Sequence, residues 1–232
     1  MLFHSWPFAL FFVVSYVVYL GLCRTRLGLP WLLAASLFFY GWSGPRFVAL
    51  LGYVIGVNFL VGLMVAREGR RKLWLAGGVA ATLAPLLWFK YAAFAVESLN
   101  AALGRLGQEA TLAAPTVALP MGLSFFTFHA LAYTFDCYRG DLKPDRSLLR
   151  FATYVAFFPK LLAGPIERAS RFLGQLAARP KRPTVADACD GASLFVVGLF
   201  KKVALADYLS LYVDRVYAAP GSFDGLTLAA AT

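Results

Sequence analysis

Long apolar runs separated by short polar segments dominate the first 140 residues of this chain. The five longest runs cover residues 6–23, 27–42, 47–66, 73–89 and 119–138. Each run is close to the roughly 17–25 residues that an α-helix needs to cross a bilayer. We therefore expect an all-α, polytopic integral membrane protein with about five spanning helices, in which residues 1–232 form a single membrane domain.

Two further segments have the pattern of helices that lie along a membrane surface. In residues 91–106, polar residues are interspersed with apolar ones, which favours a helix at the outer interface. From Ala192 onward, apolar residues alternate with charged ones such as Lys201 and Lys202, whose long side chains suit the same position. The polar stretch 179–191 between the membrane segments is predicted to be a surface connector.

Residues 148–166 depart from both patterns. Their uncharged part, 151–159, is too short to span, and basic residues flank it on both sides. Pro159, Gly164 and Pro165 interrupt helical hydrogen bonding, and irregular backbone at membrane depth survives only where protein buries it or where it lines a cavity. We predict a broken, re-entrant segment that helps to line a cytoplasm-facing cavity.

Small and polar residues inside the third run suggest helix packing. Gly52 and Gly56 form a small-xxx-small pair that favours close helix approach, and Asn58 can hydrogen-bond to a neighbouring helix. Both features are expected to hold helices together rather than to contact substrate.

Composition supports the membrane class, because 60% of the residues are hydrophobic and only 15% are charged. The net charge of +10 does not indicate nucleic acid binding, since the basic residues fall in loops rather than on one face. The 3 cysteines are far apart and form no Cys-x-x-Cys pair, so we predict neither a disulfide framework nor a metal site.

The distribution of basic residues predicts the topology. The loops at 24–26 and 67–72 together carry six Lys and Arg residues, whereas the opposite side carries three. By the positive-inside rule the first group is cytoplasmic, the N-terminus is outside, and the basic segment 139–150 is again cytoplasmic. No basic residue precedes the first run, so we expect it to stay as a membrane helix rather than to be a cleaved signal peptide.

Ionisable residues within the fifth run are the main candidates for chemistry. His129, Tyr133 and Asp136 fall on one helical stripe with Gly122, and such residues are costly inside a membrane unless they face protein or water. His129 has the pKa range of a general base, which makes it a catalytic candidate. The alternative is that His129 lines a tunnel or supports packing, and we favour this structural role. A helical spacing of three also predicts that Asp136 pairs with Arg139.

Three sequence blocks carry a resemblance to a known family. They are LPMGLSFFTFHALAYTFDCYRG at 119–140, FFPKLLAGPIER at 157–168 and GLFKKVALADYLSLYVDRVY at 198–217. In this order they resemble the membrane-bound O-acyltransferases, and most closely the bacterial branch that O-acetylates alginate. The resemblance is to the N-terminal half of a fold roughly twice this length, whose catalytic histidine lies beyond Thr232. Residues 1–232 alone are therefore expected to be inactive.

The resemblance implies a bacterial inner-membrane enzyme that moves an acyl group, expected to be acetyl, from a cytoplasmic thioester toward an exported polysaccharide. The donor would be acetyl-coenzyme A or an acyl carrier, with no bound cofactor, and the acceptor side would be the polysaccharide or a periplasmic acetyltransferase partner. Lys160, Arg168 and Arg171 near the predicted cavity mouth are candidates for binding donor phosphates. The alternative is that these three residues only set the topology.

Two other functions remain open from the sequence. The broken segment is also compatible with a transporter or channel fragment, although transporters of that kind usually carry a second, inverted copy, and none is apparent. A non-catalytic membrane scaffold that assembles with partners is the other alternative.

Overall fold

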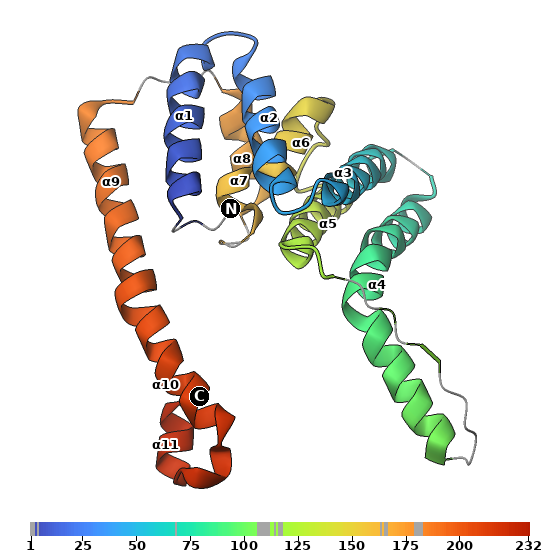
Figure 1. The fold of residues 1–232 in the computed structure, drawn as a ribbon. Coiled ribbons are helices and arrows are strands. Elements are labelled where there is room, and N and C mark those ends of the chain that lie inside the picture. The colour runs from blue at the N-terminus through green and yellow to red at the C-terminus, as the bar shows by residue number, and fades with distance from the viewer. Residues whose placement is uncertain are drawn as a thin grey trace. The chain divides into compact units, whose positions relative to one another are not determined.

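The computed structural model describes residues 3, 5–67, 69–105, 112–113, 115, 118–162, 164, 167–178 and 183–232, which contain helices and no strand. It divides the chain into two compact units, Met1–Pro180 and Lys181–Thr232. The helices of the first unit are α1 (Trp6–Leu22), α2 (Gly28–Gly41), α3 (Arg46–Val65), α4 (Arg71–Arg105), α5 (Leu123–Arg139), α6 (Leu148–Ala156), α7 (Phe158–Leu161) and α8 (Ala169–Ala177) (Figure 1). The all-α class is confirmed, and the single membrane domain over 1–232 stays a prediction.

The five predicted runs correspond to α1 through α5. By length and composition, α3 with 20 residues and α4 with 35 are apolar enough to cross a membrane, whereas α1 and α2 are apolar but shorter. The expected number of five spans is therefore not confirmed. We expected a separate interfacial helix at 91–106. This expectation is wrong in its starting point, because α4 runs without a break through that segment to Arg105. Pro85 lies inside α4, and no Gly or Pro follows it until Gly104 to stop the helix.

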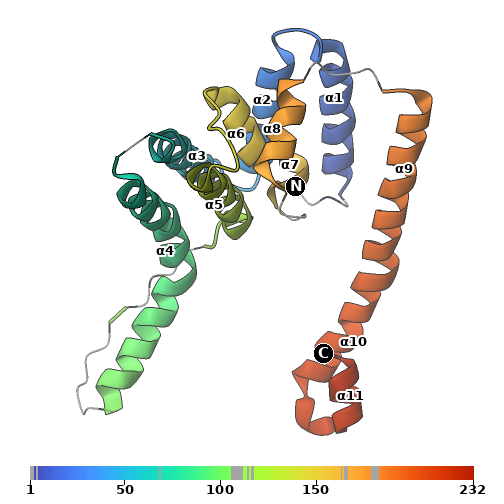
Figure 2. The same ribbon diagram turned by 180° about the vertical axis from the view of Figure 1, so that it is seen from behind.

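The first unit packs as two neighbouring groups of helices. In one group α3 contacts α4 and α5, and in the other α2 contacts α6 and α7, with α8 against α6 (Figures 1 and 2). The outer faces remain apolar: Trp6 is 89% exposed, Leu10 69% and Val17 60%. Helices that are hydrophobic on all sides suit a bilayer.

A buried polar cluster joins three helices of the first unit. Asn58 of α3 donates from Nδ2 to Thr82 Oγ1 of α4 at 2.9 Å and accepts at Oδ1 from Thr134 Oγ1 of α5 at 2.8 Å. The predicted hydrogen bond from Asn58 to a neighbouring helix is thus confirmed. Close helix approach is not made at Gly52 and Gly56, where an added Cβ would meet nothing within 4 Å. It occurs instead at Gly62, against Tyr133, and at Gly78, against Val61.

The break predicted between 148 and 166 is observed. Helix α6 ends at Ala156, Phe157 is extended, and α7 restarts with Pro159 in its first turn, where a proline needs no amide hydrogen. The amide of Phe158 donates to Ser36 Oγ in the middle of α2 at 3.2 Å. The Phe158 ring packs edge-on against Phe11 of α1, with ring centroids 5.1 Å apart. The break therefore packs against the inner faces of α1 and α2, whereas its depth in a membrane stays a prediction.

The second unit consists of α9 (Val185–Phe200), a π-helical segment (Lys201–Ala206), α10 (Asp207–Ala218), a 3₁₀ turn (Pro220–Ser222) and α11 (Gly225–Ala230). The connector expected at 179–191 is wrong from Val185 onward, because a capping box between Thr184 and Asp187 starts α9 there. Hydrogen bonds from Thr184 also lower the pKa of Asp187. Lys202 forms an ion pair with Asp207 at the end of the π-helical segment.

Candidate functional site

His129 lies in the interior of α5 and is only 1% exposed. Its Nδ1 is 2.8 Å from the carbonyl oxygen of Phe125, and because a carbonyl only accepts, Nδ1 carries the proton. The hydroxyl of Tyr154 in α6 donates to the backbone oxygens of both His129 and Glu167, each at 3.3 Å. The two blocks 119–140 and 157–168 therefore meet at this tyrosine. Both the structural role that we favour for His129 and the catalytic alternative stay predictions.

Tyr133 positions the loop that follows α5. The side chain is completely buried, with its ring centroid 4.4 Å from that of Phe151 in α6. Its hydroxyl accepts a hydrogen bond from the amide of Asp145 at 3.0 Å. Tyr133 thus links α3, α5 and α6 to the loop at 140–147.

Asp136 is half-buried, one turn from the end of α5. Its backbone oxygen accepts from the amides of Asp141 and Leu142 at 3.0 and 3.2 Å, which closes the end of the helix. The pairing expected with Arg139 is not formed: in the described part of the chain, no ion pair joins these two residues. Gly122 lies just before α5 as its N-cap, so it does not share the helical stripe.

The three candidates for donor phosphates differ in their exposure. Lys160 is only 8% exposed, with its Nζ 4.0 Å from the ring centroid of Tyr154 and 4.1 Å from that of Phe172. Both distances are typical of cation–π contacts. Arg168 and Arg171, at the start of α8, are exposed. Their role in binding the donor stays a prediction.

The three residues expected to break the segment are placed as follows. Pro159 is exposed on α7, and Gly164 is exposed with its Cβ position 3.6 Å from the Cα of Lys160. Pro165 lies outside the described residues. Whether any of them lines a tunnel stays a prediction.

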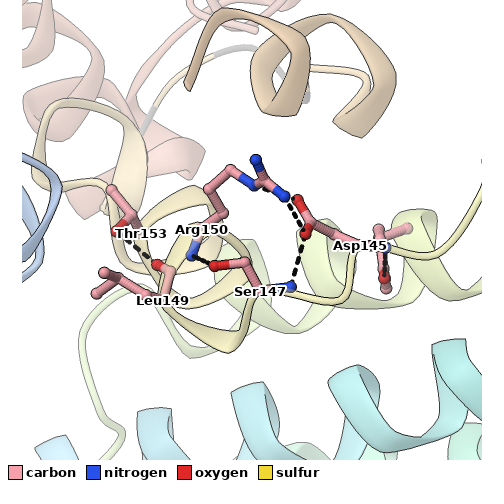
Figure 3. A network of polar contacts seen from close by, with 6 residues as sticks. Asp145, Ser147, Leu149, Arg150 and Thr153 are labelled. Atoms are coloured by element: carbon pink, nitrogen blue, oxygen red, sulfur yellow. Dashed lines mark hydrogen bonds and ion pairs between the residues drawn. The ribbon is translucent and has the colours of Figure 1, made fainter. Parts of the chain in front are cut away.

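An ordered ion pair at the start of α6 was not anticipated from the sequence. Arg150 donates from Nε and Nη2 to the two carboxylate oxygens of Asp145, both at 2.8 Å (Figure 3). The same carboxylate accepts from the amide of Ser147 at 2.7 Å, and Ser147 Oγ accepts from the amide of Arg150. The hydrogen bonds to the Asp145 carboxylate raise the pKa of the Arg150 guanidinium. An acidic and a basic residue five positions apart, Asp145 and Arg150, are the feature of the sequence that could have suggested this ion pair. The same spacing also suits a surface loop without one.

The chain is similar to curated bacterial O-acetylases. It is 40% identical to a protein of Pseudomonas putida named probable alginate O-acetylase AlgI, over 81% of this chain and 39% of that protein. A protein of the same name from Pseudomonas aeruginosa is 37% identical, with 81% and 36% covered. A Helicobacter pylori protein named peptidoglycan O-acetyltransferase is 30% identical, with 79% and 39% covered.

No family model matches the chain, and no solved structure is significantly similar to it. The relationship to the membrane-bound O-acyltransferases that the three sequence blocks predicted is confirmed by these relatives. The chain spans about two fifths of the length of the curated relatives it matches.

We expect His129→Ala to impair the protein through its fold. Removing a completely buried ring leaves a cavity between α5 and α6, which should lower the free energy of unfolding by roughly 2–4 kcal/mol. Thermal unfolding in detergent, followed by tryptophan fluorescence, measures the loss. Phe128→Ala is the matched control, since Phe128 is the neighbouring residue on α5 and is 48% exposed. A His129→Ala protein that lacks acetyl transfer but unfolds like the wild type would make His129 a catalytic residue.

Proposed function

We propose that this chain forms part of a membrane O-acyltransferase that transfers an acetyl group from a cytoplasmic thioester donor toward a hydroxyl of an exported polysaccharide. The observation that carries the proposal is the 30–40% identity, over about four fifths of the chain, to proteins named for O-acetylation of alginate and of peptidoglycan. Both names specify glycans, so we take a glycan hydroxyl as the acceptor class.

In this proposal the residues of the first unit form the framework of the reaction site. The hydroxyl must lose its proton as it attacks the thioester carbonyl, and a base must lie within about 2.6–3.2 Å of it. His129 is only 1% exposed, and the resemblance places the family's catalytic histidine beyond Thr232, so we assign the base to that part of the protein. The described residues then hold the broken segment α6–α7 against α2, which supports the predicted cavity.

The proposal is tested by acetyl transfer in membranes. Membranes that carry the chain, extended to the length of its relatives, are incubated with labelled acetyl-coenzyme A and with alginate or peptidoglycan fragments. We expect base-labile label on a glycan, and none with residues 1–232 alone. Label that reaches neither a glycan nor a protein of the membranes from the extended protein would contradict the proposed function. Turnover by residues 1–232 that His129→Ala abolishes would show that the base is His129.

The proposal also requires a cytoplasmic face for the donor. The structure brings two of the predicted cytoplasmic segments together, because Arg71 donates to the backbone oxygens of Val65 and Tyr138 at the ends of α3 and α5. We therefore expect Arg70→Cys and Lys143→Cys, in a protein whose native cysteines are replaced, to resist an impermeant thiol reagent on intact cells. Both should react after the membrane is opened. Labelling of either cysteine on intact cells would reverse the topology.

A further inference from the structure

A basic hollow lies between the end of α3, the loop after α5 and the helix α8. Its volume is about 780 Å³. The residues that line it include Ala66, Lys143, Asp145, Arg146, Arg150 and Ser170. A second hollow of about 480 Å³ shares Ala66, Pro144 and Arg146 with the first and adds Arg67. Three distant parts of the sequence therefore form one basic surface around Arg146.

Among the described residues that line this basic hollow, basic side chains outnumber acidic ones. Arg150 is neutralised by the two oxygens of Asp145, the one acidic residue in that described lining. Lys143 and Arg146 are exposed, and within the described residues neither has an ion-pair or hydrogen-bond partner. Arg67 of the adjoining hollow is also exposed. In the described part of the chain, the hollow therefore presents two cations without a partner, Lys143 and Arg146, and the exposed residue Ser170.

The loop that carries these cations is held in place. The Tyr133 hydroxyl accepts from the amide of Asp145. The Asp145 carboxylate binds Arg150 and the amide of Ser147 (Figure 3). The start of the loop is fixed by the Asp136 backbone oxygen, which accepts from two of its amides. A preorganised basic site loses less conformational entropy when a ligand binds.

We propose that this basic hollow binds a phosphate group. An arginine and a lysine without partners, next to a serine hydroxyl, supply the charge-assisted hydrogen bonds that phosphate oxygens accept. Two sources share this chemistry: the phosphates of a coenzyme A-type thioester donor and the headgroup of an anionic phospholipid. The first source rests on the proposed function, whereas the second does not.

The proposal assigns phosphate binding to residues that the sequence had associated only with topology. Lys143 and Arg146 lie in the predicted cytoplasmic segment 139–150, on the side where the donor would arrive. Lys160 faces the rings of Tyr154 and Phe172 instead, and Arg171 does not line the hollow. The basic hollow is therefore distinct from the places of Lys160 and Arg171.

The test compares four variants of the extended protein in nanodiscs. Arg146→Gln and Lys143→Gln remove cations of the basic hollow, and Arg24→Gln and Arg26→Gln, at exposed residues of another predicted cytoplasmic loop, are matched controls outside it. Coenzyme A is titrated into phosphatidylcholine nanodiscs, and thermal stability is compared between phosphatidylcholine nanodiscs and nanodiscs that contain phosphatidylglycerol. We expect Arg146→Gln to weaken ligand binding roughly tenfold, Lys143→Gln to weaken it in the same direction, and both controls to leave it unchanged. All four variants should retain the wild-type elution volume.

Each outcome decides a part of the proposal. Coenzyme A binding that falls in Arg146→Gln alone or in both hollow variants supports the site and a donor as the source. Stabilisation by phosphatidylglycerol alone, lost in the same variants, supports the site and a lipid as the source. No effect of either ligand, or equal losses in the controls, overturns the site. Ligand binding is measured without turnover, so the two proposals can fail separately. Intact binding without acetyl transfer counts against the proposed function only. Acetyl transfer without binding at the hollow counts against the basic hollow only.

Discussion

Gly122→Ala is expected to destabilise the protein by about 3 kcal/mol, through two causes that act at the same atom. Gly122 has φ +76°, where a side chain costs about 1–2 kcal/mol. A Cβ there would also lie 2.7 Å from the backbone oxygen of Leu161 and 3.2 Å from a methyl group of Leu162. A backbone oxygen cannot turn away as a flexible side chain can. The substitution should therefore separate the start of α5 from the end of α7.

Gly140→Ala is the matched control for this prediction. Gly140 ends α5 with φ +86°, yet an added Cβ would meet nothing within 4 Å. This variant should lose only about 1–2 kcal/mol, from backbone strain alone. Thermal unfolding and size-exclusion chromatography in one detergent compare the two proteins. Equal losses of stability in the two variants would show that the close contact between Gly122 and the end of α7 does not contribute to the cost of Gly122→Ala. The sequence blocks 119–140 and 157–168 would then not depend on each other at this point.

The boundaries of the first three helices were largely predictable from the sequence. The apolar runs end at charged or Gly-rich loops, so α1, α2 and α3 begin and end within a few residues of the predicted limits. Helix α4 was not predictable to the same degree, because Glu97 and Arg105 mark a change in polarity but do not stop a helix. Polarity reports the surroundings of a helix, whereas its end depends on caps and breakers.

The candidate site was predictable only where one element carries it. The interior positions of His129 and Tyr133 follow from the helical period of α5 alone. Lys160 meets Tyr154 and Phe172 from two other helices, and the basic hollow combines segments that are far apart in the sequence. The sequence contains no pattern that pairs them. Gly56 shows the same limit, since a small residue permits a close approach but only the neighbouring helix decides where it occurs.

Gly62→Ala should also have a large effect, because Gly62 is the position on α3 where the ring of Tyr133 packs against the backbone. A Cβ at Gly62 would lie 2.6 Å from Cε1 of Tyr133 and 3.2 Å from its hydroxyl oxygen. The ring cannot retreat, since Tyr133 is completely buried and packs against Phe151 on its other side. We expect a loss of roughly 2–3 kcal/mol from overpacking and from the weakened hydrogen bond to Asp145.

Gly56→Ala provides the control on the same helix. Its Cβ would meet nothing within 4 Å, so helix propensity should leave the protein unchanged or up to about 1 kcal/mol more stable. Thermal unfolding of both variants measures the difference, and Tyr133→Leu combined with Gly62→Ala tests the cause. With the smaller Leu at position 133, Gly62→Ala should lower the free energy of unfolding less than it does in the wild type. Two results would contradict this prediction: Gly62→Ala unfolds at the same temperature as Gly56→Ala, or Gly62→Ala destabilises the Tyr133→Leu protein as much as it destabilises the wild type. Either result would show that the contact between α3 and Tyr133 does not hold the loop at 140–147.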